Sequence, residues 1–465
     1  MRISLLVLTA LGCTFSLAVS GQDKPNGPLP SVPHAKGLSA QMQVQAGGTS
    51  TSTEQTIPTG MEMTVQQAEA IALRNNPQIT VGRLQALQSR ESVREVRSAL
   101  LPQAYLSVTG VQSDPGSRIA AGYITNPTVY PRTAAGATVN QLITDFGRTN
   151  NLVASQEYQA KAANESAIAT QQQIVLAVDQ AFYNALETKA LQEVAIETVN
   201  ARQLLVDQIQ ALTNAKLRSD LDLSFSQVDL SRARLLLLES NDNYQASLSI
   251  LSAILGYPDR ENFILIETPA PEVPPALDAT PLIQQAMQLR PELREMQDQV
   301  SAATKFSKAE HDLFWPTVSA SGVVGVAPVR DPHISSWYGA AGVNINIPVF
   351  NGFLFNARAK SADIETVAQQ KRLQDLEDNV ARDVRNGWLD TERAYERLKV
   401  TKELREQATL ALDLAEARYK LGLGSIVEYS QATLQKTQAD IEDTDAHYQY
   451  QISQIKLAYQ MGLTR

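Results

Sequence analysis

Two stretches in the second half of the chain alternate between apolar and polar residues. In 317–327 and 338–349, every second residue is apolar or small, and polar residues such as Ser319, Ser321 and Asn344 stand between them. This period of two predicts β-strands with one apolar and one polar face. The first half has corresponding stretches at 103–113 and 133–143. The predicted apolar face comprises Val318, Ala320, Gly322, Val324, Val326, Val343, Ile345, Ile347 and Val349.

These strands allow two interpretations. Strands of about ten residues have the length of tilted membrane-spanning β-strands, and soluble hairpins with one packed face have the same alternation. Aromatic residues at both strand ends favour the membrane, because aromatic girdles mark its two interfaces. The aromatic residues are Trp315, Phe350, Phe353 and Phe355 at one end, with Trp337 and Tyr338 at the other.

A very long helix is predicted after each pair of strands. Apolar and small residues recur there at alternating spacings of three and four, from Ile174 to Leu212 and from Leu373 to Tyr419. No proline interrupts 132–257 or follows Pro348. At 1.5 Å per residue, each helix is roughly 100 Å long. A second apolar stripe beside each seam, which includes Phe182 and Trp388, favours a closed ring of helices over a two-stranded rod.

The chain is an internal duplication. Pro77 matches Pro291 at an offset of 214, Gly147 matches Gly352 at 205, and Lys216 matches Lys420 at 204. The drop in offset predicts an inserted loop within 113–132. The two repeats are 61–260, with strands near 103–113 and 133–143, and 280–465, with strands near 317–327 and 338–349. A proline-rich linker, 261–279, joins them, and 21–60 has the composition of a disordered leader.

Each repeat contains one reversal of its long helices, near 215–224 and near 420–426. The stretches "AKLRSDLDLSFSQVDL" and "YKLGLGSIVEYSQATL" share their order of residues there. Glycines favour helix ends and serines favour helix starts. The predicted tip residues are Lys216, Leu217, Ser219, Gly422, Leu423, Gly424 and Ser425.

The first 20 residues are predicted to be a signal peptide. Arg2 precedes an apolar stretch, and Ala18 and Ser20 form a small-x-small cleavage site. Cys13 is the only cysteine, so cleavage after Ser20 leaves no disulfide or thiol chemistry; lipidation of Cys13 stays open. No later apolar run reaches the length of about 18 residues that a membrane-spanning helix needs.

Composition excludes several classes of function. The net charge is −9 and no basic cluster occurs, which argues against nucleic acid as a partner. The four histidines, His34, His311, His333 and His447, are scattered, and no hydrolase, phosphate-binding or zinc motif is present. We therefore expect no enzyme activity, no cofactor and no metal site.

Two strand pairs, two long helical hairpins and a signal peptide together resemble the TolC family of outer membrane efflux proteins. The resemblance covers 61–465 and rests on "LITDFGR" and "IPVFNGF", with Gly147, Pro348 and Gly352 at the strand-to-helix joins, and on "ARYKLGLGSIVEYSQATL". It implies a homotrimer in which four strands per chain close a 12-stranded barrel in outer membrane lipid. That barrel continues into a periplasmic α-helical barrel, which holds most of the mass.

The resemblance also implies which residues surround the periplasmic aperture. Tyr419 matches a tyrosine that holds the aperture shut, and Glu428 matches the first of two acidic positions. Gln431 replaces the second acid and Gly424 replaces a basic residue, so the cation selectivity of the tip stays open. Asp220 and Asp222 are candidates to supply charge from the first tip, in a register uncertain by two residues. The alternative for Glu428 is a solvated acid favoured by the helix dipole.

The expected function is the exit duct of a tripartite efflux or type I secretion system. A periplasmic adaptor and an inner-membrane pump of the RND, ABC or MFS type are the implied partners. Drugs, metals, peptides and proteins all stay open as cargo. The alternative is an exported coiled-coil scaffold or adhesion protein without a pore, which would need no lipid-facing strands.

Overall fold

A computed structural model describes residues 61–112, 118–121, 124–128, 132–267, 272–328 and 335–463 of the protein. They all belong to the unit Thr59–Arg465. The predicted signal peptide 1–20, the leader 21–60 and Cys13 lie outside the described residues, as do 268–271 of the linker. In the described ranges, no helix is both long and apolar enough to cross a membrane.

The predicted duplication is confirmed by the order of elements. Repeat 1 runs α1 (Val65–Asn75), α2 (Pro77–Arg97), β2 (Gln103–Val111), β5 (Arg132–Thr144), α3 (Arg148–Asn214) and α4 (Asp220–Ile254). Repeat 2 runs α5 (Thr280–Leu289), α6 (Pro291–His311), β7 (Thr317–Val326), β8 (Trp337–Asn346), α7 (Leu354–Lys420) and α8 (Ile426–Gln460). The predicted insertion contains an antiparallel pair, β3 (Arg118–Ala121) and β4 (Ile124–Thr128). A parallel pair, β1 (Met61–Met63) and β6 (Phe263–Leu265), joins the start of repeat 1 to the linker that follows it, so the predicted linker contains a short strand.

Local sequence explains where the shorter helices begin. Thr64 and Gln67 form a capping box at the start of α1. Asn76 accepts a hydrogen bond from the backbone of Gln78 at 2.9 Å, and Pro77 occupies the first turn of α2. Pro291 occupies the same place in α6. Each proline therefore separates a short helix from the longer one that follows it.

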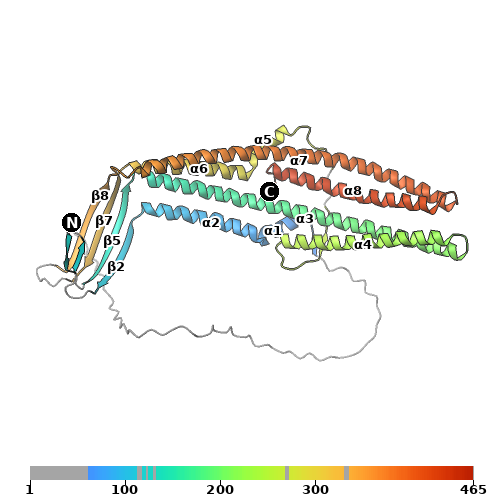
Figure 1. The fold of residues 1–465 in the computed structure, drawn as a ribbon, viewed down its shortest axis with the longest axis horizontal. Coiled ribbons are helices and arrows are strands. Elements are labelled where there is room, and N and C mark those ends of the chain that lie inside the picture. The colour runs from blue at the N-terminus through green and yellow to red at the C-terminus, as the bar shows by residue number, and fades with distance from the viewer. Residues whose placement is uncertain are drawn as a thin grey trace, which may run out of the picture. The chain divides into compact units, whose positions relative to one another are not determined.

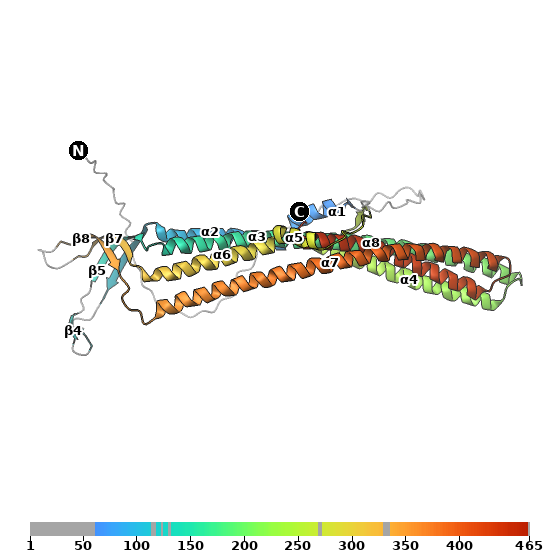
Figure 2. The ribbon, with the colours of Figure 1, turned by 90° about the horizontal axis from the view of Figure 1, so that it is seen from above.

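The long helices pack side by side in one layer (Figures 1 and 2). α3 packs against α2, α4, α6 and α8, and α7 packs against α6 and α8. The largest buried cluster surrounds Phe182 and Val178 of α3 with Leu251 of α4, and a second one includes Val380 and Val384 of α7. The predicted seam is buried at many positions, among them Ile174, Ala181, Ala195, Arg202, Ile209, Gly387, Thr391, Leu398, Ala408, Ala415 and Tyr419.

The strands of both repeats form one antiparallel sheet in the order β2-β5-β7-β8. Figure 1 shows it at one end of the helical layer, with the two helix tips at the other. Its register places apolar and small residues on one face of all four strands, which confirms the alternation predicted for β7 and β8. The apolar and small residues of that face are Ala104, Leu106, Val108, Ala135, Ala137, Val139, Val318, Ala320, Gly322, Val324, Val326, Trp337, Gly339, Ala341, Val343 and Ile345, and two polar residues of β5, Thr133 and Gln141, lie among them.

The opposite face is polar, and the two outer strands have one free edge each. Ser107, Asn140, Ser321 and Asn344 all lie on this face. Within the described residues, β2 pairs only with β5 and β8 pairs only with β7. β8 ends at Asn346 rather than continuing to 349, because Pro348 has no N–H to donate to a neighbouring strand.

The joins between the sheet and the long helices use two consecutive residues in the left-handed region. These are Phe146 (φ 56°) and Gly147 (φ 111°) before α3, and Gly352 (φ 60°) and Phe353 (φ 64°) before α7. The starts of α3 and α7, at Arg148 and Leu354, are 206 residues apart. The counterpart of Gly147 is therefore Phe353 rather than Gly352. The buried carboxylate of Asp145 accepts a 2.7 Å hydrogen bond from the backbone of Thr149 and so closes the first join.

Candidate functional site

The two helical hairpins end in turns of the same backbone geometry. Leu217 N–H donates to the carbonyl of Leu212 at 2.8 Å, and Leu423 N–H donates to the carbonyl of Arg418 at 2.8 Å. These bonds form a Schellman motif, which needs a left-handed residue just before the donor. Lys216 (φ 58°) and Gly422 (φ 73°) occupy that position.

This geometry corrects the matching of the two tips. Lys216 is the counterpart of Gly422 at an offset of 206, so the pairing of Lys216 with Lys420 was wrong by two residues. It was based on a shared Lys-Leu pair, whereas the backbone conformation decides the equivalence. The same offset makes Asp222 the counterpart of Glu428. Ser219 caps the backbone N–H of Asp222 at 3.1 Å, and Ser425 caps that of Glu428 at 3.2 Å.

Tyr419 occupies the centre of the contact between the two hairpins. Its side chain is 6% exposed and packs with Leu205 and Ile209 of α3 and Ile426 of α8. The Tyr419 and Tyr429 rings are stacked, with centroids 5.6 Å apart and planes 7° apart. Tyr419 of α7 is therefore fixed by residues of α3 in the first hairpin and of α8 in the second.

Arg218, in the first tip, extends over Tyr419 of the second hairpin. Its guanidinium carbon lies 4.2 Å from the ring centroid, and Nη2 donates to the Tyr419 carbonyl at 2.9 Å. Sequence reasoning missed this residue. The family resemblance implies a basic residue just before Ser425, but Gly424 occupies that position. The basic residue is Arg218, which precedes Ser219, the equivalent N-cap of the first tip.

The Tyr419 hydroxyl does not take part in these contacts. It is buried and has no hydrogen-bond partner among the described residues. Burial raises the pKa of Tyr419. The nearby positive charge of Arg218 acts against this rise, and the negative charge of Asp222 adds to it. The ring and the backbone carbonyl therefore make the contact between the hairpins.

The acidic candidates lie at the starts of α4 and α8. Glu428 accepts a 3.0 Å hydrogen bond from Nε of Arg418, and both side chains are about half exposed. This ion pair lies within the second hairpin and offsets the charge of Glu428. Asp220 is exposed, Asp222 is half-buried toward Tyr419, and Gln431 is exposed.

A second polar contact between the hairpins lies farther from the tips. The Ser430 hydroxyl of α8 donates to the carboxylate of Asp229 of α4. The same carboxylate lies 3.8 Å from Nη1 of Arg202 in α3, which is 5% exposed. Burial lowers the pKa of Arg202, and Asp229 counters that effect. The only signal in the sequence was a charged residue, Arg202, inside an otherwise apolar seam.

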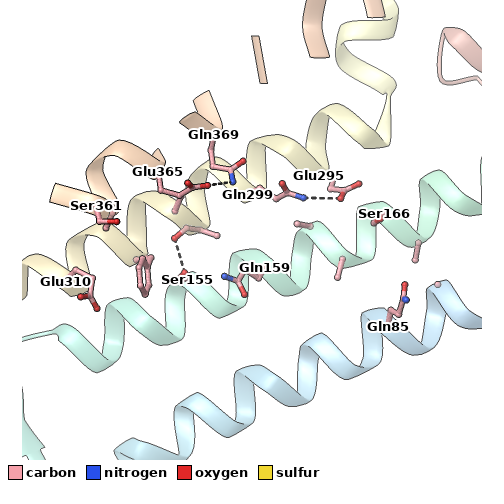
Figure 3. A pocket seen from close by; sticks show the side chains of 18 of the residues that line it. Gln85, Ser155, Gln159, Ser166, Glu295, Gln299, Glu310, Ser361, Glu365 and Gln369 are labelled. Carbon is pink, nitrogen blue, oxygen red and sulfur yellow. Dashed lines mark hydrogen bonds between the residues drawn. The ribbon is translucent and has the colours of Figure 1, made fainter. Parts of the chain in front are cut away.

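A cavity of about 920 Å³ with a mixed polar and apolar lining lies between α2, α3, α6 and α7 (Figure 3). Residues from all four helices line it, so the layer curves around this space. Three carboxylates and one guanidinium are among the lining groups: Glu295, Glu310, Glu365 and Arg358. Burial raises the pKa of Glu295, whose carboxylate accepts a 3.0 Å hydrogen bond from Gln299.

The family model for outer membrane efflux proteins matches residues 70–257 and 282–463, one match in each repeat. The chain belongs to the outer membrane efflux protein family. It is therefore a transport channel of the outer membrane and not an enzyme, and the family gives no support to the scaffold alternative. In the described part of the chain, no group of three or more His, Cys, Asp or Glu residues is placed to hold a metal ion.

Individual relatives of the family align over most of the chain. Outer membrane protein TolC of Salmonella enteritidis is 23% identical over 422 residues, covering 86% of this chain and 83% of TolC. TolC of Vibrio cholerae serotype O1 is 24% identical over 424 residues, covering 84% and 89%. The Campylobacter jejuni CmeC outer membrane channel superposes with a TM-score of 0.73 at 15% identity over 86% of both chains. The open state of the Neisseria gonorrhoeae MtrE channel superposes with a TM-score of 0.69 at 17% identity, covering 86% of this chain and 90% of MtrE.

Proposed function

We propose that three copies of this chain form one channel that crosses the outer membrane and continues through the periplasm. The channel is the exit duct of a tripartite efflux or type I secretion system. It is closed at the tips of its helical hairpins, and it opens when a periplasmic adaptor and an inner-membrane pump of the RND, ABC or MFS type engage it. The proposal places most of the mass in the periplasm.

The four-stranded sheet is the observation that carries this proposal. Apolar and small residues predominate on one face of all four strands, which suits contact with lipid. Its two edges, on β2 and β8, have no partner in the described chain. Unpaired backbone groups are costly in lipid, so such a sheet must close on further strands. Three copies supply twelve strands, which close into one barrel with the polar face inward.

The helices have corresponding free edges. In the hairpin region α3 packs on α4 and α8, and α8 packs on α7, so α4 and α7 are the outer helices. Both carry exposed apolar residues, and those on α4 have the spacings of three, four and seven typical of a coiled-coil seam. We propose that α4 of one copy packs on α7 of the next. The exposed residues are Leu221, Phe225, Val228, Leu235 and Leu238 on α4, and Val400, Leu404, Leu410 and Leu414 on α7.

The cavity between α2, α3, α6 and α7 supports an aqueous interior. Residues of α2, α3, α6 and α7 line the cavity, and in the proposed ring of copies the cavity faces the axis. Amide, hydroxyl and carboxylate groups line it together with Phe306 and several alanines, and the charged groups among them suit water and polar cargo rather than lipid. The excess of carboxylates over Arg358 favours cations in the interior.

The tips support a closed state. Arg218 holds Tyr419, and Ser430 holds Asp229, so both contacts must break when the two hairpins separate. Leu217 and Leu423 are 71% and 69% exposed at the two turns. Exposed apolar side chains at such a position suit a protein partner. We propose that they contact the adaptor together with Lys216, Ser219, Gly422, Gly424 and Ser425, while Tyr419, Glu428, Gln431, Asp220 and Asp222 surround the aperture.

Conductance across a planar lipid bilayer tests this function. The protein would be extracted by detergent from the outer membrane fraction and cross-linked to establish its oligomeric state. We expect a trimer that gives small discrete conductance steps, as a channel closed at one end should. Protein that salt alone extracts, and that gives no steps while remaining folded, would contradict the channel and support the scaffold.

A further inference from the structure

Tyr338 lies over two glycines on neighbouring strands. In the register of the sheet, Tyr338 of β8 pairs with Gly325 of β7, and Gly325 pairs with Gly136 of β5. A Cβ atom built at Gly325 would lie 2.6 Å from the Tyr338 hydroxyl oxygen, and one built at Gly136 would lie 2.8 Å from it. Both distances are shorter than carbon–oxygen contacts allow, so only glycine leaves room for the ring.

The ring therefore lies flat against the sheet. Neighbouring strands are about 4.8 Å apart, and the hydroxyl of Tyr338 crosses β7 to reach β5. Glycine weakens a strand because it adds conformational freedom and no side chain to pack. Steric fit to the ring of Tyr338 explains why two neighbouring strands both have glycine at this level of the sheet. The ring in turn covers the backbone that these glycines leave exposed.

This ring is on the polar face of the sheet. Tyr338 shares that face with Asn344 and Asn346 of the same strand, whereas its neighbour Trp337 is on the apolar face with Val343 and Ile345. The sequence had grouped Trp337 and Tyr338 as one aromatic girdle, and the register separates them. Tyr338 is near the end of β8 farthest from the join to α7.

We propose that Tyr338 sets the width of the outer end of the channel, and that Gly325 and Gly136 keep it wide by holding the ring against the wall. This inference rests on the proposed function, in which the polar face lines the interior of a closed barrel. Three copies of the ring then lie at one level of the pore. Lifting them from the wall would narrow the pore there.

A displaced ring has no second place to lie flat. On the other side of β8, the closed barrel would place β2 of the next copy. The polar face of β2 carries Tyr105, Ser107 and Thr109, and its Gly110 is on the apolar face. A ring that leaves the two glycines must therefore project into the pore.

Reaction of an engineered cysteine in intact cells tests this inference without depending on the state of the tips. Asn344→Cys places a thiol on the polar face of β8, farther along the pore than Tyr338 when entered from outside. The single native cysteine, Cys13, precedes the predicted cleavage site. A small and a bulky thiol reagent would be added outside the cells, and the reaction rate of each would be measured in the Asn344→Cys protein.

Gly136→Val is the test variant, because its side chain occupies the place of the Tyr338 hydroxyl. Gly342→Val is the matched control: it adds the same bulk to the same face, at a position where a Cβ would have nothing within 4 Å. We expect Gly136→Val to slow the bulky reagent several-fold and to leave the small reagent unchanged. Gly342→Val should change neither rate, and adding Tyr338→Ala to Gly136→Val should restore the rate of the bulky reagent.

The outcomes separate this inference from the function on which it rests. An unchanged rate of the bulky reagent in Gly136→Val would overturn the role of Tyr338. A slow rate that Tyr338→Ala fails to restore would also overturn it, since the obstruction would then not be the ring. If Asn344→Cys reacts with neither reagent in protein that forms heat-stable trimers, the polar face does not line a pore, and the proposed barrel is wrong.

Discussion

The guanidinium of Arg218 lies 4.2 Å from the centre of the Tyr419 ring and donates to the carbonyl of the same residue at 2.9 Å. The two residues are 201 positions apart and belong to different hairpins. A cation over a buried ring contributes about 0.5–2 kcal/mol, and a hydrogen bond from a charged donor contributes about 1.5–3 kcal/mol. This pair is therefore a strong polar contact between the hairpins in a single chain.

Arg218→Ala should open the tip. Loss of both contacts favours the open state by about 2 kcal/mol, so we expect larger and more frequent conductance steps in a planar bilayer. Lys420→Ala is the control, because it removes one positive charge at the neighbouring second tip. The partner of Lys420, Glu416, lies on the same helix as Lys420 and not on the other hairpin. Equal effects of the two variants would mean that charge alone, and not the contact with Tyr419, keeps the tip closed.

The hydroxyl of Tyr419 should be dispensable. The family resemblance implied that Tyr419 holds the aperture shut, but its hydroxyl has no hydrogen-bond partner among the described residues. We now expect Tyr419→Phe to conduct like the wild type, whereas Tyr419→Leu, which loses the stacking on Tyr429 and the contact with Arg218, should conduct more. A large effect of Tyr419→Phe would show that the hydroxyl gains a partner in the assembled trimer.

Asp229→Ala should destabilise the hairpins. It leaves the buried guanidinium of Arg202 without its carboxylate and the Ser430 hydroxyl without its acceptor. Removing one partner of a buried ion pair costs about 3–5 kcal/mol. Thermal unfolding followed by circular dichroism would show the loss. Arg232→Ala is the control. Arg232 pairs with the same carboxylate, but its side chain is 70% exposed. Its removal should therefore lower the free energy of unfolding by about 1 kcal/mol or less.

Glu428→Gln should lower the preference of the tip for cations. Glu428 is paired with Arg418, and neutralising the acid leaves that arginine uncompensated in every copy around the aperture. The reversal potential in a salt gradient measures the preference. Arg418→Gln should shift it in the opposite direction. Unchanged selectivity in both variants would place the pair away from the aperture and leave Glu428 as a solvated acid at the start of a helix.

Stability should fall as the pH rises from about 4 to about 8. Burial, and then the neighbouring carboxylate of Glu69, raises the pKa of Asp179 from 3.8 to about 8. Burial, and then Asp445, raises the pKa of Glu187 from 4.5 to about 7, although Gln449 and Arg397 counter this. The folded protein holds these two protons more tightly than the unfolded chain does. Their contribution to the free energy of unfolding is therefore complete below the ordinary pKa values of 3.8 and 4.5, and it is lost as the pH rises from there through the raised values of about 8 and about 7.

Unfolding midpoints at a series of pH values would measure this slope. Asp179→Asn should flatten it, because the amide cannot ionise, while Asp207→Asn, at an exposed position on the same helix, should leave it unchanged. A midpoint that rises with pH over this range would contradict the assignment.

Features that depend on local periodicity could be predicted from the sequence. The spacing of three and four from Ile174 to Leu212 predicted a continuous helix, and α3 spans 67 residues. The alternation around Val324 and Val343 predicted two-faced strands, which the sheet contains. The register of the tips could not be read in this way: Lys216 and Gly422 share a left-handed backbone but not a residue type, so matching residue types gave the wrong offset.

The sequence by itself thus determined the duplication, the long helices, the two faces of the strands and the family, because each follows from patterns among residues close in the chain or from residue motifs. Only the tertiary structure decided that Arg218 meets Tyr419, that Ser430 meets Asp229, and that Tyr338 lies on Gly325 and Gly136. These contacts join segments far apart in the chain. Their partners are fixed by how helices and strands pack in three dimensions, and no local pattern encodes that packing.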